Sequence, residues 1–131
     1  MNEIIRGLWI GDRFDAESWV GESICVLRDD EIITPPDSCR KASVRFPLAS
    51  ARNNNTNVII SHRELDTVAG VIMRMLVSSG RVLVFCNSGS ERSPLAVAWY
   101  LHLYQGYNLD DAYRLLISKR PIIQDRRHWV I

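Results

Sequence analysis

The sequence predicts an α/β fold with a central, mostly parallel sheet flanked by helices. Short runs of apolar and β-branched residues alternate along the chain with longer runs that have the apolar spacing of amphipathic helices. This order builds strand–helix–strand units, which are typical of parallel sheets. A chain of 131 residues with 47% hydrophobic and 24% charged residues can bury a core, so we expect a single domain over residues 1–131.

Four segments have the composition of strands, because β-branched and aromatic residues are concentrated in them and turn residues separate them. The last of the four is the most apolar, and it ends at Cys86. The predicted strands are residues 3–10, interrupted by Gly7, then 23–27, 42–46 and 81–86. Residues 48–57, between the third and fourth strands, are polar, and we expect them to be irregular.

Four other segments have the composition of helices. The longest, residues 63–78, places its apolar residues on one face, and Ser61 and Glu64 have the spacing of a capping box at its start. Residues 95–104 are apolar on nearly all sides, so we expect this helix at the centre of the fold. The predicted helices are a short one from Asp12 to near Gly21, then residues 63–78, 95–104 and 108–119.

The stretch from Val82 to Pro94 has the pattern of a phosphate-binding loop. An apolar strand ends at Cys86, a polar loop containing Gly89 follows, and Arg92 stands just before a helix. Backbone N–H groups of such a loop attract anions, together with the positive end of the helix dipole. An arginine can hold two phosphate oxygens at once. The same positive field favours a thiolate at the start of the loop, so the pattern predicts a nucleophilic cysteine beneath a bound phosphate.

This Cys-x5-Arg-Ser arrangement resembles the signature of cysteine-dependent protein tyrosine phosphatases, and the chain length is similar to that of their small (atypical) dual-specificity branch. The resemblance implies a dual-specificity-phosphatase-like fold with Cys86 as the thiolate, Arg92 as the phosphate clamp and Ser93 as a hydroxyl that aids release of the thiolate. It also implies a substrate-binding loop whose amides face the phosphate, made of Asn87, Ser88, Gly89, Ser90, Glu91 and Arg92. The resemblance implies no metal and no cofactor.

Weaker similarity to dual-specificity phosphatases extends along most of the chain, at residues 5–16, 24–27, 80–84, 95–113 and 120–123. Nothing in the sequence resembles the loop with which the larger classical enzymes select phosphotyrosine. The resemblance therefore implies a shallower pocket, open to phosphoserine and phosphothreonine as well as to phosphotyrosine.

Three departures from the family pattern bear on activity. Phe85 stands where the family usually has a histidine that helps to set the geometry of the loop, and Glu91 stands where serine or asparagine is usual. A carboxylate facing another negative charge at ~4 Å costs about 4 kcal/mol at an effective dielectric near 20, so Glu91 must point away or form an ion pair that holds the loop.

The aspartate general acid of the family has no counterpart, because residues 48–57 contain no carboxylate. Such an acid contributes roughly 10²–10⁴-fold to the rate, so we expect weak turnover.

The leading hypothesis is a protein phosphatase that hydrolyses phosphotyrosine, phosphoserine and phosphothreonine esters of phosphoprotein substrates through a phosphocysteine intermediate. One alternative is a pseudophosphatase, a phosphate-binding interaction module without turnover. A second alternative is an RNA 5′-triphosphatase, whose leaving group is itself a phosphate and tolerates the absent acid. The formal net charge of +1 gives no broad nucleic-acid footprint, so we expect nucleic acid as a partner only under the second alternative.

Composition limits the setting in which the protein works. The sequence has no apolar run of about 18 residues and no signal-peptide pattern, so we expect no membrane partner. Three cysteines do not suggest a disulfide framework, which favours a reducing compartment, either the cytoplasm or the nucleus. Cys25, in a predicted strand, is expected as a core residue. Arg126 and Arg127 are expected as a solvated tail, with contact to an anionic substrate or partner as the alternative.

Overall fold

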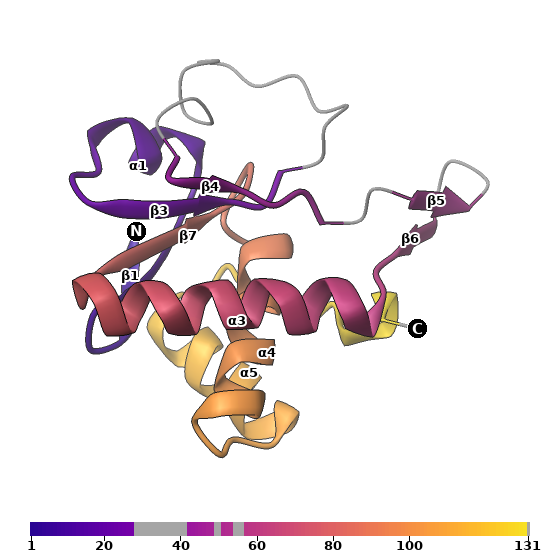
Figure 1. Cartoon of the computed structure of the whole chain (residues 1–131). Helices are drawn as coiled ribbons and strands as arrows, with labels where there is room; N and C mark the ends of the chain where they lie inside the picture. Colours follow the sequence, from indigo (N-terminus) through magenta and orange to yellow (C-terminus); the bar gives the residue numbers. More distant parts are fainter. Residues whose placement is uncertain (28–41, 49–50, 54–56, 131) are drawn as a thin grey trace.

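The described strands form one five-stranded sheet and one small hairpin (Figure 1). A computed structural model describes residues 1–27, 42–48, 51–53 and 57–130. The main sheet has the order β1 (Asn2–Ile5), β2 (Leu8–Gly11), β7 (Val82–Phe85), β3 (Glu22–Cys25), β4 (Val44–Arg45). β1 is antiparallel to β2, and the other neighbouring pairs are parallel. The prediction of an α/β fold with a mostly parallel sheet is therefore confirmed.

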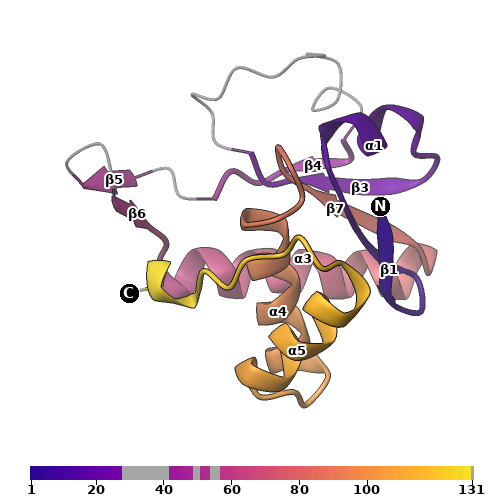
Figure 2. The same cartoon turned by 180° about the vertical axis from the view of Figure 1, so that it is seen from behind.

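Helices cover both faces of the sheet (Figures 1 and 2). The short α1 (Arg13–Ser18) lies on one face, and α3 (His62–Ser79), α4 (Arg92–Tyr104) and α5 (Leu109–Lys119) lie on the other. Each face has its own buried cluster, the larger one with Val84 of β7 and the smaller one with Phe85. This division follows from the alternation of side chains along a strand. α4 is the central helix, with residues 93–101 buried, as its apolar sequence predicts.

Local capping chemistry sets the helix boundaries. Ser61 and Glu64 form the predicted capping box, because the N–H of Glu64 donates to Ser61 Oγ at 3.1 Å and the N–H of Ser61 donates to Glu64 Oε2 at 2.9 Å. At the other end of α3, the N–H of Gly80 donates to the carbonyl of Leu76 at 2.9 Å. Among the helices that the structure describes, none combines the length and the apolar character that crossing a membrane requires.

The interruption predicted at Gly7 is confirmed, because residues 3–10 form two strands, β1 and β2, and the chain turns back between them. Two other segments differ from what their sequence predicts. The strand predicted at 42–46 is only two residues long, at β4. Residues 48–57, expected to be irregular, include β5 (Ala51–Asn53), which pairs with the antiparallel β6 (Asn57–Ile59). Strands this short and polar carry no apolar alternation by which a sequence pattern could reveal them.

The parallel strands end at the same level of the sheet. In the register, Phe85 of β7 is level with Gly11 of β2 and with Cys25 of β3, and Cys25 is level with Arg45 of β4. The loops that follow these strands therefore begin along one edge. In open α/β sheets this edge is where ligands bind. It is also where Cys86 begins the connection from β7 to α4.

Cys25 is fully buried in β3, as expected of a core residue, but it is also disulfide-bonded. The cysteine count suggested no disulfide framework, so the sequence did not predict this bond. Pairing depends on how closely the fold brings two Cα atoms together, which spacing along the chain does not reveal. Within the described residues, Cys86 is the free cysteine.

Candidate active site

Cys86 begins the loop between β7 and α4, and only 2% of its surface is exposed. Its Sγ lies 3.2 Å from Oγ of Ser93, which is fully buried in the first turn of α4. The two side chains predicted as nucleophile and as partner of the thiolate are therefore in hydrogen-bonding contact. A hydroxyl at this distance can donate to a thiolate and stabilise its charge.

The side chain of Arg120 holds the middle of the loop formed by residues 86–92, which we call the cradle. Arg120 follows α5 and is only 8% exposed. Its Nη2 donates to the carbonyl of Ser88 and its Nε to the carbonyl of Gly89, both at 3.0 Å. Its Nη1 donates to Oδ1 of Asn2 at 2.8 Å, which joins the cradle to β1. A planar guanidinium suits this task because its N–H groups have fixed directions.

Two backbone groups hold the cradle on either side of the Arg120 contacts. The N–H of Arg13, in α1, donates to the carbonyl of Asn87 at 3.3 Å, and the Arg13 guanidinium donates to the same oxygen at 3.1 Å. The N–H of Gln124 donates to the carbonyl of Ser90 at 2.8 Å. With the two bonds from Arg120, the carbonyls of the successive residues 87–90 all accept hydrogen bonds from outside the cradle.

The direction of these carbonyls sets the direction of the cradle's amides. In a planar trans peptide, the C=O of one residue and the N–H of the next point in opposite directions. Because the carbonyls of residues 87–90 point outward to Arg13, Arg120 and Gln124, the N–H groups of residues 88–91 point into the cradle. A concave row of N–H groups next to a helix N-terminus forms an anion-binding site.

Gly89 allows the cradle to pack this closely against its supports. Its φ is 70°, in the left-handed region that favours glycine. A Cβ at this residue would lie 2.7 Å from Nη2 of Arg120 and 2.7 Å from the carbonyl oxygen of Gly11. Both the backbone conformation and the available space therefore require glycine, and the close approach joins the cradle to the end of β2.

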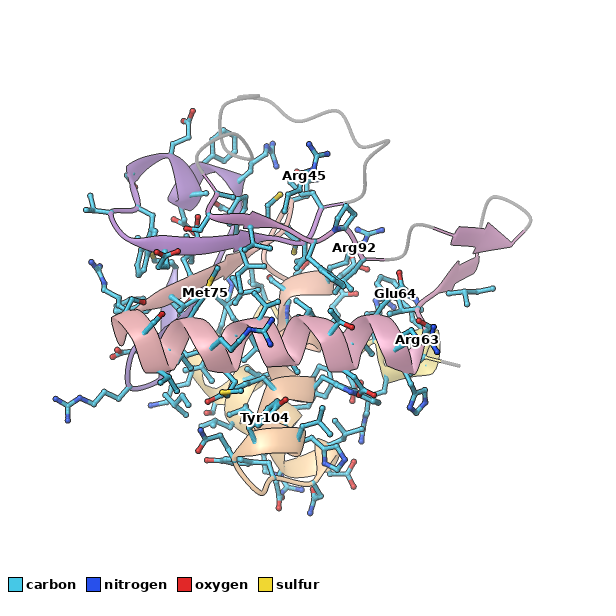
Figure 3. The ribbon with its side chains drawn as sticks, in the orientation of Figure 1. Arg45, Arg63, Glu64, Met75, Arg92 and Tyr104 are labelled. Atoms are coloured by element: carbon cyan, nitrogen blue, oxygen red, sulfur yellow. The ribbon has the colours of Figure 1, made fainter. Side chains whose placement is uncertain are left out.

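Arg92 is the first residue of α4, which begins three residues before its predicted start at residue 95. Its guanidinium carbon lies 5.7 Å from the centre of the Trp129 ring, within the range of a cation–π contact. Figure 3 shows Arg92 at the same edge of the sheet as Arg45, the last residue of β4. This position allows the guanidinium and the N-terminal dipole of α4 to act on the same anion.

Glu91 forms an ion pair, one of the two arrangements expected for a carboxylate beside a phosphate site. Its Oε2 lies 3.0 Å from Nε of Arg126. The expectation of a solvated tail is therefore wrong for Arg126, and it is also wrong for Arg127, which pairs with Asp110 and Asp125. The hydrogen bond from Arg127 lowers the pKa of Asp110. Glu91 and Asp110 are remote from these arginines in sequence, so only the fold brings the charges together.

Phe85 is fully buried in the smaller apolar cluster, with Leu27 and Leu83. Its ring can offer the cradle no hydrogen bond of the kind that a histidine would make there. The described cradle contacts come instead from Arg13, Arg120 and Gln124. The departure at Phe85 therefore removes one support of the loop but leaves the others in place.

The described residues contain no carboxylate at the family's general-acid position. Residues 48–57 have none in the sequence. In α3, Asp66 accepts a hydrogen bond from Trp99 Nε1 at 2.8 Å, and Glu64 serves the capping box. The other carboxylates near this position in the sequence include Asp29, Asp30 and Asp37, which lie outside the described residues. The site thus brings together a candidate nucleophile and a candidate phosphate clamp without an assigned proton donor.

Sequence reasoning did not identify Arg13, Arg120 and Gln124 as residues that support the cradle. The signal for Arg120 was its place in the segment 120–123, which is similar to the family, but its burial was not predicted. Gln124 supports the cradle through its backbone N–H, so its side chain carried no signal.

Two other features lie away from the cradle. A cavity of about 450 Å³ sits at the opposite end of β7, and its lining includes Leu76, Gly80 and Tyr104 but no cradle residue. Within the part of the chain that the structure describes, no three His, Cys, Asp or Glu side chains gather as metal ligands would. The proposed function is therefore argued from the cradle, not from this cavity or from a metal site.

The chain is similar to known proteins in both sequence and fold. A family model described as "Dual specificity phosphatase, catalytic domain" matches residues 39–130. Phosphoglucan phosphatase LSF1, a chloroplastic protein of Arabidopsis thaliana, is 28% identical over 93 residues, which cover 69% of this chain and 15% of that protein. The chain therefore spans far less than the full length of this relative.

Solved structures share the fold at lower identity. The human tyrosine phosphatase-like serine/threonine/tyrosine-interacting protein has a TM-score of 0.74 at 23% identity, over 98% of this chain and 89% of that chain. Human DUSP28 has a TM-score of 0.72 at 18% identity, over 98% of this chain and 90% of that chain. At these identities the likeness establishes the fold alone.

Proposed function

The chain belongs to the family of dual specificity phosphatase catalytic domains, and we propose that it is a phosphatase that acts through Cys86 on phosphorylated proteins. The observation that carries this proposal is the orientation of the cradle, in which the N–H groups of residues 88–91 point inward. Ser93 within hydrogen-bonding distance of the thiol, and Arg92 at the start of α4, support it further.

In the proposed reaction, the Cys86 thiolate attacks phosphorus, an S–P bond forms, and the P–O bond to the leaving group breaks. The cradle amides and the Arg92 guanidinium bind the equatorial oxygens, which carry the charge in the transition state. Water then attacks the phosphocysteine, and the S–P bond breaks to release phosphate. The Ser93 hydroxyl donates to the departing thiolate, since the two atoms lie 3.2 Å apart before reaction. No step requires a metal.

Because the family position holds no carboxylate, the leaving oxygen departs as an anion and takes its proton from solvent. A phenolate is a better leaving group than an alkoxide, so phosphotyrosine is the favoured substrate and phosphoserine and phosphothreonine are hydrolysed more slowly. The curated relative is named a phosphoglucan phosphatase, which indicates that substrates differ among similar chains.

The test of the chemistry is hydrolysis of p-nitrophenyl phosphate by the wild-type protein and by Cys86→Ser. We expect release of p-nitrophenol by the wild type and none above background by the variant. Rapid-quench labelling with ³²P-phosphotyrosine peptide should trap a thiol-linked phosphate, labile in mild acid and stable in alkali, on the wild type only. Equal rates for the two proteins would overturn the role of Cys86.

One observation favours a second candidate function, a phosphate-binding pseudophosphatase. Residues 48–57 supply no acid, while the cradle retains an inward row of amides. Under this alternative, the wild-type protein would bind phosphotyrosine peptide and tungstate in calorimetry but release no phosphate from any aryl ester. Measurable turnover that depends on Cys86 excludes the alternative.

A further inference from the structure

We infer that Arg126 is a positioning residue that neutralises Glu91 at the end of the cradle and thereby allows the cradle to hold a dianionic phosphate. This inference rests on the proposed function, because it concerns the same anion site. It assigns a role to a residue that lies outside the Cys-x5-Arg-Ser segment and that the proposed reaction does not use.

Glu91 carries the one carboxylate of the cradle, and its negative charge opposes that of the proposed ligand. It directly precedes Arg92, and its own N–H belongs to the inward row of residues 88–91. Its carboxylate is 3.0 Å from Nε of Arg126, with side-chain exposures of 35% for Glu91 and 30% for Arg126. Such a partly buried pair is screened less by salt than a pair in open solvent.

Arg126 is held in this position by several groups. Its guanidinium lies 5.3 Å from the centre of the Trp129 ring and also donates to Oε1 of Gln124. Trp129 is itself fixed, because its carbonyl accepts a hydrogen bond of 2.9 Å from the N–H of Ile60. The N–H of Gln124 is bonded to the carbonyl of Ser90, so the segment that carries Arg126 runs alongside the cradle.

The same indole connects the ion pair to the candidate phosphate clamp. The Trp129 ring lies within cation–π distance of both Arg126 and Arg92, at 5.3 Å and 5.7 Å. Without Arg126, the charge of Glu91 would repel a bound dianion and would offer Arg92, its neighbour in sequence, a competing partner. Both effects weaken anion binding, and both require the negative charge of Glu91.

This dependence on charge makes the inference testable by a double-mutant cycle in the full chain, with sodium tungstate as the oxyanion probe and isothermal titration calorimetry at constant ionic strength. We expect Arg126→Gln to bind tungstate at least tenfold more weakly than the wild type, a difference of about 1.4 kcal/mol. We expect the double variant Glu91→Gln/Arg126→Gln to regain affinity to within about threefold of the wild type, because the uncompensated charge is gone.

Arg127→Gln is the matched control. It removes the same charge from the adjacent residue, whose guanidinium pairs with Asp110 and Asp125 instead of a cradle residue. Its affinity for tungstate should stay within about threefold of the wild type, as expected for a pair remote from the anion. Arg126→Lys keeps the charge and should lose less affinity than Arg126→Gln. Thermal unfolding of each variant identifies any that is not folded at the assay temperature.

The outcomes separate this inference from the proposal on which it rests. If the wild-type protein binds no tungstate, the phosphate site and this inference both fail. If the wild type binds but Arg126→Gln binds equally well, the role of Arg126 alone is overturned. The role is also overturned if the loss in Arg126→Gln persists in the double variant, since a purely structural defect would not be rescued at Glu91. Should Arg126→Gln not fold, Arg126→Met, which also removes the charge, is paired with Glu91→Gln to complete the same cycle.

Discussion

The cradle and the β5–β6 hairpin are built in different ways. The cradle is bonded to α1, to Arg120 after α5 and to the segment that contains Gln124 and Arg126. The two strands of the hairpin pair with each other. The residue that follows the hairpin, Ile60, forms a β-bridge with Val130 of the C-terminal segment. In related phosphatases the second region supplies the general acid, and in this chain it has no carboxylate. Under the proposed function, anion binding and proton donation would depend on separate parts of the fold, so one could be present without the other.

The largest expected effect concerns the leaving group, because it tests the region without a carboxylate. The kcat/KM for a phosphoserine peptide should be lower than that for p-nitrophenyl phosphate by at least the roughly 10²–10⁴-fold that a general acid contributes. A series of aryl phosphates with leaving groups of rising pKa should show steadily falling rates. Steady-state assays at pH 7 measure both. Rates independent of the leaving group would mean that a proton donor reaches the site from another part of the chain.

The second effect tests the cradle through Gly89→Ala. The added Cβ would lie 2.7 Å from both Arg120 Nη2 and the carbonyl of Gly11, so the cradle must shift and its affinity for tungstate should fall by about 100-fold, or about 2.7 kcal/mol. Calorimetry measures the loss.

Gly80→Ala is the control for the Gly89 substitution, since Gly80 also has a positive φ of 73° but its Cβ would meet nothing within 4 Å. It should lose about 1–2 kcal/mol of stability from backbone strain and bind tungstate as the wild type does. Similar affinities in both variants would indicate that the cradle tolerates displacement from its supports.

The third effect concerns Arg120→Lys, which keeps the positive charge. A lysine ammonium lacks the planar guanidinium geometry that donates at once to the carbonyls of Ser88 and Gly89 and to the amide oxygen of Asn2. We expect about tenfold weaker tungstate binding, the lower range for a lost charged hydrogen bond, and a lower melting temperature. Lys119→Ala, an exposed substitution at the adjacent residue, is the control. Unchanged affinity in Arg120→Lys would show that the cradle keeps its orientation without this support.

The smallest effect concerns Asp110→Asn, which removes a contact of the C-terminal segment away from the cradle. Arg127 lowers the pKa of Asp110 in the folded protein, so the contribution of this carboxyl to stability is present above its unfolded pKa and is lost as the pH falls through the folded value. The variant should melt slightly below the wild type at pH 7, and the difference should vanish in strong acid. Tungstate affinity should not change. A difference in melting temperature that persists in acid would contradict the assigned cause.

Some features could be predicted because they depend on residues close together in the chain. The capping box of Ser61 and Glu64 is one example, and the end of a strand at Cys86 is another. The β5–β6 hairpin, the disulfide bond of Cys25 and the ion pair of Arg127 with Asp110 could not be predicted in the same way. Each of these depends on partners chosen by the fold or on strands too short and polar to show a pattern.

Residues 82–94 alone are enough to predict that a strand, a polar loop and a helix meet between Cys86 and Arg92, because strand propensity, one glycine and a proline after the loop act over a few residues. The outward direction of the cradle carbonyls and the neutralisation of Glu91 depend instead on the folded chain. Arg13, Arg120 and Gln124 donate hydrogen bonds to these carbonyls, and Arg126 forms the ion pair with Glu91. They are distant from the cradle in sequence, and their hydrogen bonds form only when the folded chain brings them to the end of β7.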